Sequence, residues 1–498
     1  MAISTAVSLS AVARVVGIQT RFVDLRQGNV VFLPQHLAVI GQGASSVTYA
    51  TTKIQLSSAG EVGERFGYGS PLHLAARQLF PVSGDGVGAI PVTFFPLEDD
   101  GLAVTADATI TPTGTATKQG TVNIKIAEIE AEAVVVEVDD TVADVTAKVT
   151  SAINAVLNMP ALATDNNTDV GLAAKWAGES GNDLTITIDE PGDLGITFAI
   201  TNFANGATNP DVQPALDQFG NVWYSMVLNC LNQSDTTALD AINAFGEGRW
   251  GALTRKPFVS FNGVTTADVN TATTLPDSRA SDRINGQLPA PGSNEYPAVV
   301  AARQLARIIV RANNNPPYDY GSLKANGIAP GTDGEQWDYP KRDQAVKAGS
   351  STIEVRDGVV NIGDVVTFYH PSGEAVPPYR YLVDIVKLQN IIFNLDLIFV
   401  NEEWDGAPLV PDDQAITNRA AKRPKDAVTA INGVIESLGL NAIISDPDTA
   451  KTRTVAGINE QNPKRLDARA TVQLAGNTNI KSVDLDFGFY FGVAPLVA

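Results

Sequence analysis

The sequence KSVDLDFGFYF, residues 481–491, is the most regular pattern in the chain. Every second position is apolar, and the apolar residues are Val483, Leu485, Phe487, Phe489 and Phe491. Strict alternation of this kind predicts a β-strand with one buried face. A strand so near a chain end either closes its own sheet or completes the sheet of a neighbouring molecule, because an unpaired edge is a template for another chain.

The N-terminal region repeats this pattern more weakly, since Val16, Ile18, Thr20 and Phe22 fall on one parity. A subunit with such a strand at each end is able to link to others at both ends. The sequence therefore predicts two terminal arms, residues 1–22 and residues 480–498, that pair with neighbouring subunits.

The bulk properties narrow the class of protein. At 498 residues the chain is too long for one core, and the usual domain size of ~100–200 residues suggests three or four domains. No uninterrupted apolar run reaches the ~18 residues of a membrane span, and no basic region precedes the first apolar residues, so we expect neither a span nor a cleaved signal. Cys230 is the single cysteine and excludes an internal disulfide. A net charge of −20 argues against a nucleic-acid-binding surface.

The negative charge is concentrated between residues 98 and 206. This segment has 18 acidic residues against 4 basic ones, a local net of −14 out of the total of −20. Alternating runs at Thr121–Ile126 and Leu184–Ile188 predict strands, and Thr141–Leu157 has a helical apolar stripe. We expect residues 98–206 to form an acidic, mainly-β outer domain inserted into a host.

The host alternates strand and helix patterns. Predicted strands are His36–Gly41, Gly88–Phe95, Trp223–Leu231 and Phe258–Phe261; predicted helices begin at Ser70-Pro71, Thr237 and Tyr296. This alternation is typical of an α/β layer. Residues 23–97 and 207–340 together are expected to form an α/β middle domain.

The pattern changes from Lys341 onward. A short helix precedes two strand-like runs, STIEV and VVNIGDVVTFY, and Asp357–Gly358 between them is a strong hairpin signal. Helices are predicted at Tyr381–Val400 and from Pro424 to Leu438, and strands at Ala470–Leu474 and Val483–Phe491. Residues 341–479 are therefore expected to be a C-terminal α+β domain of a mixed α/β (α+β), multidomain chain.

Signs of chemistry are few. The three histidines, His36, His73 and His370, and the single cysteine do not have zinc-site spacing. The Gly-rich piece at residues 41–46 lacks the third glycine and the following helix of a dinucleotide loop, so it is interpreted as a turn. We expect no catalytic, cofactor-binding or metal-ligating residues and no enzymatic activity. Two rivals stay open: an α/β hydrolase with His370 as the base, beside Pro371-Ser372-Gly373, and a surface-layer or adhesion protein.

One basic cluster stands against the overall charge. The sequence NRAAKRPK, residues 418–425, places Arg419, Lys422, Arg423 and Lys425 within two turns at a predicted helix start. The cluster is either a solvated helix end or a contact for an acidic partner.

Several stretches, in order, resemble the contractile-tail sheath proteins of Mu-like bacteriophages. They are HLAVIGQGAS, VGERFGYGSPLHLAARQLF, TGTATKQGTVNIKI, GESGNDLTITI, KRDQAVKAGSSTIEVRDGVVNIGDVVTFY and NPKRLDARATVQLAGNTNIKSVDLDF. The ending GDVVTFYH departs from the more usual Arg-bearing, Thr-Thr-Tyr ending of the family, which puts only local contacts in doubt.

The resemblance implies a mechanical role. Subunits of this family form stacked hexameric rings around a tail tube, terminal arms add strands to the sheets of neighbours, and contraction drives the tube through the host envelope for genome ejection. It implies a subtilisin-like middle fold, here without a triad, and a tube-proximal C-terminal domain in which the basic cluster is the candidate tube contact.

The partners implied by the resemblance are the chain itself, the tail tube protein, and baseplate and tail terminator proteins. Nucleic acid, membrane insertion and cofactors are not expected. The implied location is the tail of a virion made in the bacterial host cytoplasm, and a phage-derived bacteriocin or injection particle is the alternative.

Overall fold

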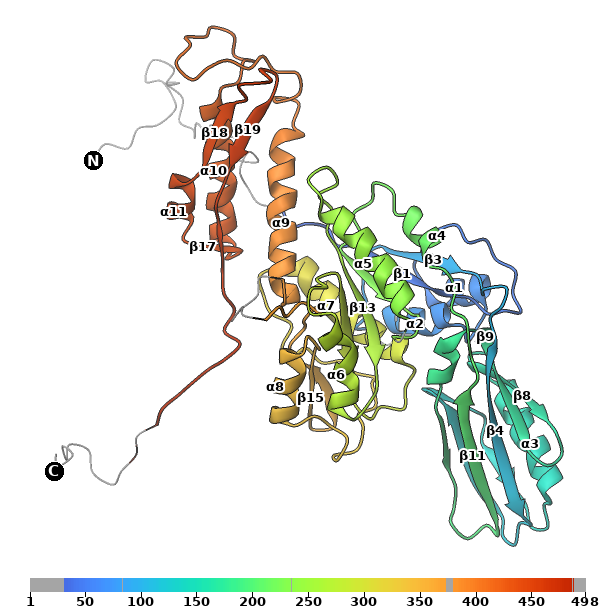
Figure 1. Ribbon diagram of the computed structural model, residues 1–498. Coiled ribbons are helices and arrows are strands. Elements are labelled where there is room, and N and C mark those ends of the chain that lie inside the picture. Colours follow the sequence, from blue (N-terminus) through green and yellow to red (C-terminus); the bar gives the residue numbers. More distant parts are fainter. Residues whose placement is uncertain (1–30, 83, 234, 373–378, 486, 488–498) are drawn as a thin grey trace, which may run out of the picture.

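The computed structural model describes residues 31–82, 84–233, 235–372, 379–485 and 487. Three parts follow one another in space (Figure 1): an elongated β unit, a central α/β body and a smaller helical unit joined to the body by the long helix α9 (Leu382–Phe399). The predicted mixed α/β, multidomain architecture is confirmed at this level. Among the described residues, no helix combines the length and the apolar character needed to cross a bilayer.

The central body is built on one six-stranded sheet with the order β14-β13-β12-β1-β3-β2. Its strands are β1 (Leu37–Gln42), β2 (Ile54–Leu56), β3 (Val92–Leu97), β12 (Met226–Asn229), β13 (Val259–Val264) and β14 (Asn285–Pro289). All neighbours pair in parallel except β2, which runs antiparallel to β3 at the edge. The chain adds strands on one side of β1 and then on the other, so the order reverses between β1 and β12, as in doubly wound folds.

Helices cover both faces of this sheet. They are α1 (Ala59–Phe66), α2 (Pro71–Leu79), α4 (Gln213–Asp217), α5 (Thr236–Trp250), α6 (Val269–Ser278) and α7 (Pro297–Asn314). β1 is buried along its whole length; Leu37 and Val39 join the core under α2 and α7, whereas Ala38 and Ile40 join the core under α4 and α5. Alternate side chains of a strand point to opposite faces, which explains why this strand has no polar parity.

The predicted start of α2 is confirmed. Ser70 is the N-cap and its hydroxyl accepts from the backbone N–H of His73 at 3.4 Å, while Pro71 occupies the first turn, where its missing N–H costs no hydrogen bond. The helix is buried nearly all round because α1 and α7 pack against it.

The elongated unit lies between β3 and α4 in the chain. It contains β4 (Thr105–Gly114), β5 (Gly120–Ile126), β6 (Ile129–Glu130), β7 (Val134–Val136), α3 (Val142–Ala155), β8 (Ala161–Asp165), β9 (Val170–Ala177), η2 (Glu179–Asp183), β10 (Ile186–Asp189) and β11 (Ile196–Ala204). One sheet has the order β11-β4-β9-β8, and a second joins β10, β5, β6 and β7. The strands predicted at 121–126 and 184–188 and the helix predicted at 141–157 are thus confirmed to within a few residues. Val104 pairs with Ala207, so the two connections to the body leave side by side.

The last part of the chain contains α8 (Tyr339–Lys347), β15 (Ile353–Arg356), β16 (Val359–Ile362), α9, α10 (Pro424–Leu440), β17 (Ile444–Ser445), α11 (Pro447–Thr452), β18 (Val455–Ile458), β19 (Leu466–Arg469) and β20 (Gln473–Leu474). The predicted hairpin is confirmed: β15 and β16 pair antiparallel, and Asp357 and Gly358 both have positive φ, as a tight hairpin turn requires.

One strand prediction is wrong in extent, and another has no strand in the residues that the structure describes. The strand predicted through VVNIGDVVTFY ends at Ile362, because the chain then leaves the hairpin and Thr367 bridges to Gly286 at the edge of the central sheet. The strand predicted for Val483–Phe491 is not formed in the part that the structure describes, residues 481–485 and Phe487. Within the described ranges no strand pairs with these residues, and a strand needs a partner for its backbone groups.

Candidate assembly surfaces

The elongated unit covers the edge of the central sheet where a doubly wound fold binds its ligands. That edge lies at the carboxyl ends of β1 and β12, where the strand order reverses. Gln42 at the end of β1 donates through Nε2 to Asp99 Oδ1 and to the Ala177 carbonyl, each at 2.6 Å. The Trp176 ring packs edge-on against Tyr296, with centroids 5.6 Å apart, and both are fully buried. These two rings fill the crevice between β1 and β12, and a polar pocket of about 430 Å³ lined by Asp100, Glu179 and Asp235 remains beside them.

Buried carboxyl groups lie at this joint. Burial raises the pKa of Glu128 and of Asp183, both in the elongated unit, to about 7, and does the same for Glu295 in the body. Asp183 accepts from Asn232 Nδ2 at 2.6 Å, and Glu295 accepts from the Ala329 N–H at 2.7 Å. Raised carboxyl pKa values often mark catalytic sites, but here they arise because two units close over the side chains.

His370, the candidate base of the rival hydrolase, is held by two contacts. Its Nδ1 donates to the Phe368 carbonyl at 2.6 Å, and its Nε2 lies 3.4 Å from Asp277 Oδ1. A hydrolytic triad needs one ring nitrogen on a carboxylate and the other on a nucleophile. Within the described part of the chain, neither nitrogen of His370 is hydrogen-bonded to a hydroxyl, so the arrangement does not match a triad.

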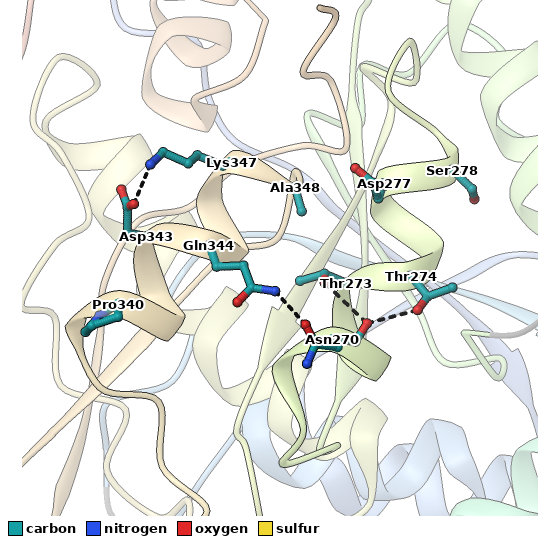
Figure 2. Close-up of a pocket in the computed structure, with 10 residues that line it drawn as sticks. All are labelled: Asn270, Thr273, Thr274, Asp277, Ser278, Pro340, Asp343, Gln344, Lys347 and Ala348. Atoms are coloured by element: carbon teal, nitrogen blue, oxygen red, sulfur yellow. Dashed lines mark hydrogen bonds and ion pairs between the residues drawn. The ribbon is translucent and has the colours of Figure 1, made fainter.

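Asp277 also lines a groove between α6 and α8, shown in Figure 2. The polar side chains there are used locally: Gln344 Nε2 donates to Asn270 Oδ1 at 2.8 Å, Thr274 donates to the Asn270 carbonyl at 2.9 Å, and Lys347 pairs with Asp343 at 2.5 Å. These contacts join one helix to another or close single helical turns, and they leave no activated nucleophile.

The described residues were also inspected for a metal site and for a phosphate-binding loop. No group of three or more His, Cys, Asp or Glu side chains in the described ranges is arranged to hold a metal ion. The Gly-rich piece after β1 continues into a turn at Ser45 and Ser46, and the next helix, α1, begins only at Ala59. The interpretation of this piece as a turn is confirmed.

The basic cluster lies mostly before α10 rather than in its first turns. The helix begins at Pro424 with Arg423 as N-cap, so Arg419 and Lys422 belong to the preceding loop. The position predicted for these two residues, at the start of a helix, is wrong because Pro424 sets the helix start.

Much of the positive charge of this cluster is already paired. Lys422 Nζ lies 3.1 Å from Glu403 and 5.1 Å from the centre of the Trp404 ring. Arg423 pairs with Asp426 at 3.3 Å, and Lys425 donates to the Asp412 carbonyl at 2.8 Å. Arg419 and Lys425 are both exposed, and no ion pair to either is found among the described residues. Because Lys425 already donates to a backbone carbonyl, Arg419 is the more available of the two for a partner.

The C-terminal segment is the most conspicuous exposed apolar feature. After β20 the chain runs away from the body past the end of α9 (Figure 1). Val483 is 85% exposed, Leu485 78% and Phe487 92%, and Ile480 before them is 88% exposed. Three apolar residues of one parity are thus fully presented to solvent. The other arm residues predicted from the sequence, Val16, Ile18, Phe22, Phe489 and Phe491, lie outside the described residues.

The helical unit beside this segment has small, incomplete sheets. β17 pairs with β20 over two residues, and β18 pairs with β19 over four. A partly apolar groove lies between α9, α10 and β19; its lining includes Ile392, Leu395, Phe399 and Ile431. Two-stranded ribbons of this size are marginal by themselves, so this unit offers both open strand edges and unfilled apolar surface.

Sequence reasoning missed one group of residues in α9. Lys387, Asn390 and Asn394 are buried, polar and spaced i, i+3 and i+7, which places them on one face of a largely apolar helix. The sequence signal that could have revealed these residues is their helical spacing within a largely apolar 18-residue helix.

The chain was compared with protein families, with curated proteins and with solved structures. No family model matches the chain. The Mu-like prophage FluMu tail sheath protein of Haemophilus influenzae is 23% identical over 454 residues, which cover 89% of this chain and 91% of that protein.

Among solved structures, the sheath tail protein from Listeria innocua has a TM-score of 0.50 at 12% identity, covering 91% of this chain and 95% of that one. The sheath tail protein from Desulfitobacterium hafniense has a TM-score of 0.46 at 11% identity, with 93% and 97% covered. At such identities the solved structures bear on the fold alone. The resemblance to tail sheath proteins of the Mu-like group is confirmed.

Proposed function

We propose that this chain is the structural and mechanical subunit of a contractile tail sheath, which polymerises around a tail tube and contracts to drive the tube through an envelope. The observation that carries the proposal is the exposed C-terminal segment: alternating apolar residues without a strand partner in the part of their own chain that the structure describes. Its likeness over nearly the full length to a prophage tail sheath protein supports the same reading.

The energetics of the arm explain why a lattice suits it. Burial of its five apolar residues at ~1.5–3 kcal/mol each contributes on the order of 10 kcal/mol at most. Ordering about ten residues opposes this by ~1–2 kcal/mol each, so one arm docks close to neutrality. Two arms per subunit, repeated around rings and between rings, stabilise the polymer through effective concentration. The free subunit stays unassembled until others are gathered beside it.

The finer arrangement follows the family resemblance. Subunits are proposed to form stacked hexameric rings in which the N- and C-terminal arms add strands to the sheets of neighbours. Residues 341–479 face the tube, the middle domain (23–97 with 207–340) keeps the subtilisin-like relationship, and residues 98–206 project outward. The tail tube, baseplate and terminator proteins are the proposed partners, and assembly takes place in the host cytoplasm.

No enzymatic activity belongs to this proposal. The sheet edge that would hold a substrate is filled by Trp176 and Tyr296, and His370 is bonded to Phe368 and Asp277. A sheath uses binding energy stored in the lattice, which requires no nucleophile. The same mechanics serve an infectious phage and a phage-derived bacteriocin or injection particle.

The test uses the parity of the arm. Full-length protein is expected to form tubes on negative-stain electron micrographs. The triple variant Val483→Ser, Leu485→Ser, Phe487→Ser, or deletion of residues 480–498, is expected to leave a folded monomer with an unchanged Tm and no tubes, because the apolar face is lost while the monomer does not use it.

The matched control changes the opposite parity of the same segment. Ser482→Ala with Asp484→Ala changes two intervening residues of the arm but leaves the apolar face intact, so tubes should persist. Tubes from the apolar-face variant, or their loss from both variants alike, would refute a strand docked through that face.

A further inference from the structure

Helix α9 contacts the root of both terminal segments, although these are far apart in sequence. At the N-terminal side, the Leu33 N–H donates to Asn390 Oδ1 at 2.8 Å, and the Val31 N–H donates to Asn394 Oδ1 at 3.0 Å. Asn394 Nδ2 donates back to the Val31 carbonyl at 3.0 Å. The segment that emerges at residue 31 is therefore fixed to α9 as though to a neighbouring strand, through side-chain amides instead of backbone.

At the C-terminal side the same helix uses a buried lysine. Lys387 is 1% exposed, and its ammonium donates to the Ala475 carbonyl at 2.6 Å, to Asn477 Oδ1 at 2.6 Å and to Asp384 Oδ1 at 3.0 Å. Three acceptors satisfy its three donors, which is the condition for burying a charged group. Asn477 also donates to the Pro317 carbonyl at 2.8 Å. Beyond this contact the exposed arm begins.

These three side chains share one face of α9, and another polar residue marks the opposite face. Positions 387, 390 and 394 are in register on the helix, and the distance from the first to the last is about 10 Å at ~1.5 Å per residue. Gln389 points the other way, donating to the Ser225 carbonyl at 3.2 Å and the Pro257 carbonyl at 3.1 Å in the central body. One face of the helix thus holds the segment roots, and the other holds the body (Figure 1).

We infer that α9 is the anchor helix of the subunit, in which Lys387, Asn390 and Asn394 position both terminal arms. A force applied to one arm is then transmitted to the other arm through about two turns of this helix. The central sheet and the elongated unit are attached to α9 through its Gln389 face. They therefore lie outside the path of the force and are not stretched when neighbouring subunits move apart. Buried polar side chains in a helix are costly unless they are hydrogen-bonded, and here each bonds to residues 31–33 or 475–477, the segments next to the two predicted arms.

The anchoring contacts can be tested in the isolated monomer by hydrogen–deuterium exchange. Asn390→Leu and Asn394→Leu are expected to speed exchange in peptides covering residues 31–36 about tenfold, and Lys387→Met in peptides covering 475–480, because each variant removes buried hydrogen bonds that hold the segment. The control is Gln389→Leu, which removes an equally buried amide from the same helix; it should lower Tm and leave both segments unchanged. Unchanged exchange in the anchor variants, or equal effects from Gln389→Leu, would overturn the inference.

A second variant keeps the lysine contact testable if Lys387→Met does not fold. Asn477→Ala removes the acceptor on the arm side without altering α9, and it is expected to release the same peptides. If Asn477→Ala leaves exchange across 475–480 unchanged, the contact of Lys387 with Asn477 does not hold the arm, and the inference fails on the C-terminal side.

The mechanical consequence rests on the proposed sheath function and has its own readout. Tubes formed by Lys387→Met or Asn390→Leu protein are expected to break under shear into pieces several-fold shorter than those of Gln389→Leu, measured on micrographs. If the full-length protein forms no tubes, the sheath proposal fails while the exchange experiment still decides the anchor. If tubes form and all variants break alike, the force path is wrong even where the contacts are right.

Discussion

The elongated unit and the helical unit at the other end of the molecule use strands in opposite ways. The first has two four-stranded sheets, and in one of them β4 pairs with β9 on one side and with β11 on the other. The second has only ribbons of two strands, two to four residues long. Its core cluster comprises eight buried residues, Ile391, Ile431, Val434, Ile435, Leu438, Ile443, Ile444 and Ala450. Leu440 and Val455 beside it are 80% and 57% exposed.

This difference in strand pairing indicates which unit is expected to take part in assembly. Three or more strands with a buried face are stable by themselves, whereas a two-stranded ribbon needs something to pack against. The elongated unit is complete and presents an acidic exterior, which favours a solvated surface. The helical unit is incomplete in both hydrogen bonds and apolar packing. An added strand from a neighbour would supply both, and the exposed C-terminal segment has the matching pattern.

The largest difference in tube formation is expected between a variant that lacks the elongated unit and one that lacks a ribbon of the helical unit. Replacement of residues 104–207 by a short Gly-Ser linker should leave tube formation intact, because Val104 N donates to the Ala207 carbonyl at 2.9 Å and the two ends are already adjacent. The excised piece should fold alone, with a cooperative thermal transition by circular dichroism.

The counterpart removes a comparable feature from the incomplete unit. Replacement of residues 455–469, the β18–β19 ribbon, by the same linker should abolish tubes while the remaining body still unfolds cooperatively. Loss of tubes in the first variant, or tubes in the second, reverses the comparison.

The same contrast explains how far the sequence could be read. Continuous apolar runs such as Leu37–Gln42 predicted the buried strands, and Ser70-Pro71 predicted a helix start, because burial on both faces and capping leave local signatures. The acidic composition of residues 98–206 coincides with the sheets of the elongated unit for the same reason: a self-contained unit carries its own pattern.

The parts that the sequence did not reveal depend on distant partners. Nothing local in the sequence indicates that Lys387 will donate to the Ala475 carbonyl, or that Glu128 will accept from the Tyr296 backbone N–H. In the described part of the strand predicted for residues 483–491 no strand is formed, and the reason is related: period-two alternation specifies a strand face but not which molecule provides the adjacent edge. Pairing of Lys422 with Glu403 is likewise invisible in the charge pattern of residues 418–425.

A smaller effect is expected at the joint between the elongated unit and the body. Glu128 and Glu295 have pKa values of about 7 in the folded protein against 4.5 for an ordinary glutamate, because burial disfavours the ionised form. The folded state binds these protons more tightly, so its stability is full below about pH 4.5, falls as pH rises to about 7 and is level above that.

The measurement is the free energy of unfolding by denaturant at pH 5 and pH 8. Glu128→Gln with Glu295→Gln should reduce the wild-type loss between these two pH values by about 2–4 kcal/mol, since neutral amides do not titrate. Glu130→Gln on the neighbouring strand is the control, because Glu130 is exposed and pairs loosely with Lys125 at 3.7 Å. An equal change in the control would assign the pH dependence to the general acidity of the unit instead of to the joint.

The smallest effect on the monomer, and a decisive one for the tube, is expected from Arg419. Because Lys422, Arg423 and Lys425 already contact Glu403, Asp426 and Asp412, reversing all four charges would disturb the loop as well as any partner. Arg419→Glu alone should change the free energy of unfolding by less than ~0.5 kcal/mol, as substitutions of exposed charges usually do.

If this surface faces an acidic tube, the variant should lose most co-sedimentation with purified tail tube protein while tubes of sheath alone still form. Lys324→Glu, an exposed reversal of the same size on the central body, should bind the tube as wild type does. Undiminished binding by Arg419→Glu would remove the basic cluster from the inner surface, and the tube-facing side of the helical unit would then have to be sought on the ribbons and the groove between α9 and α10.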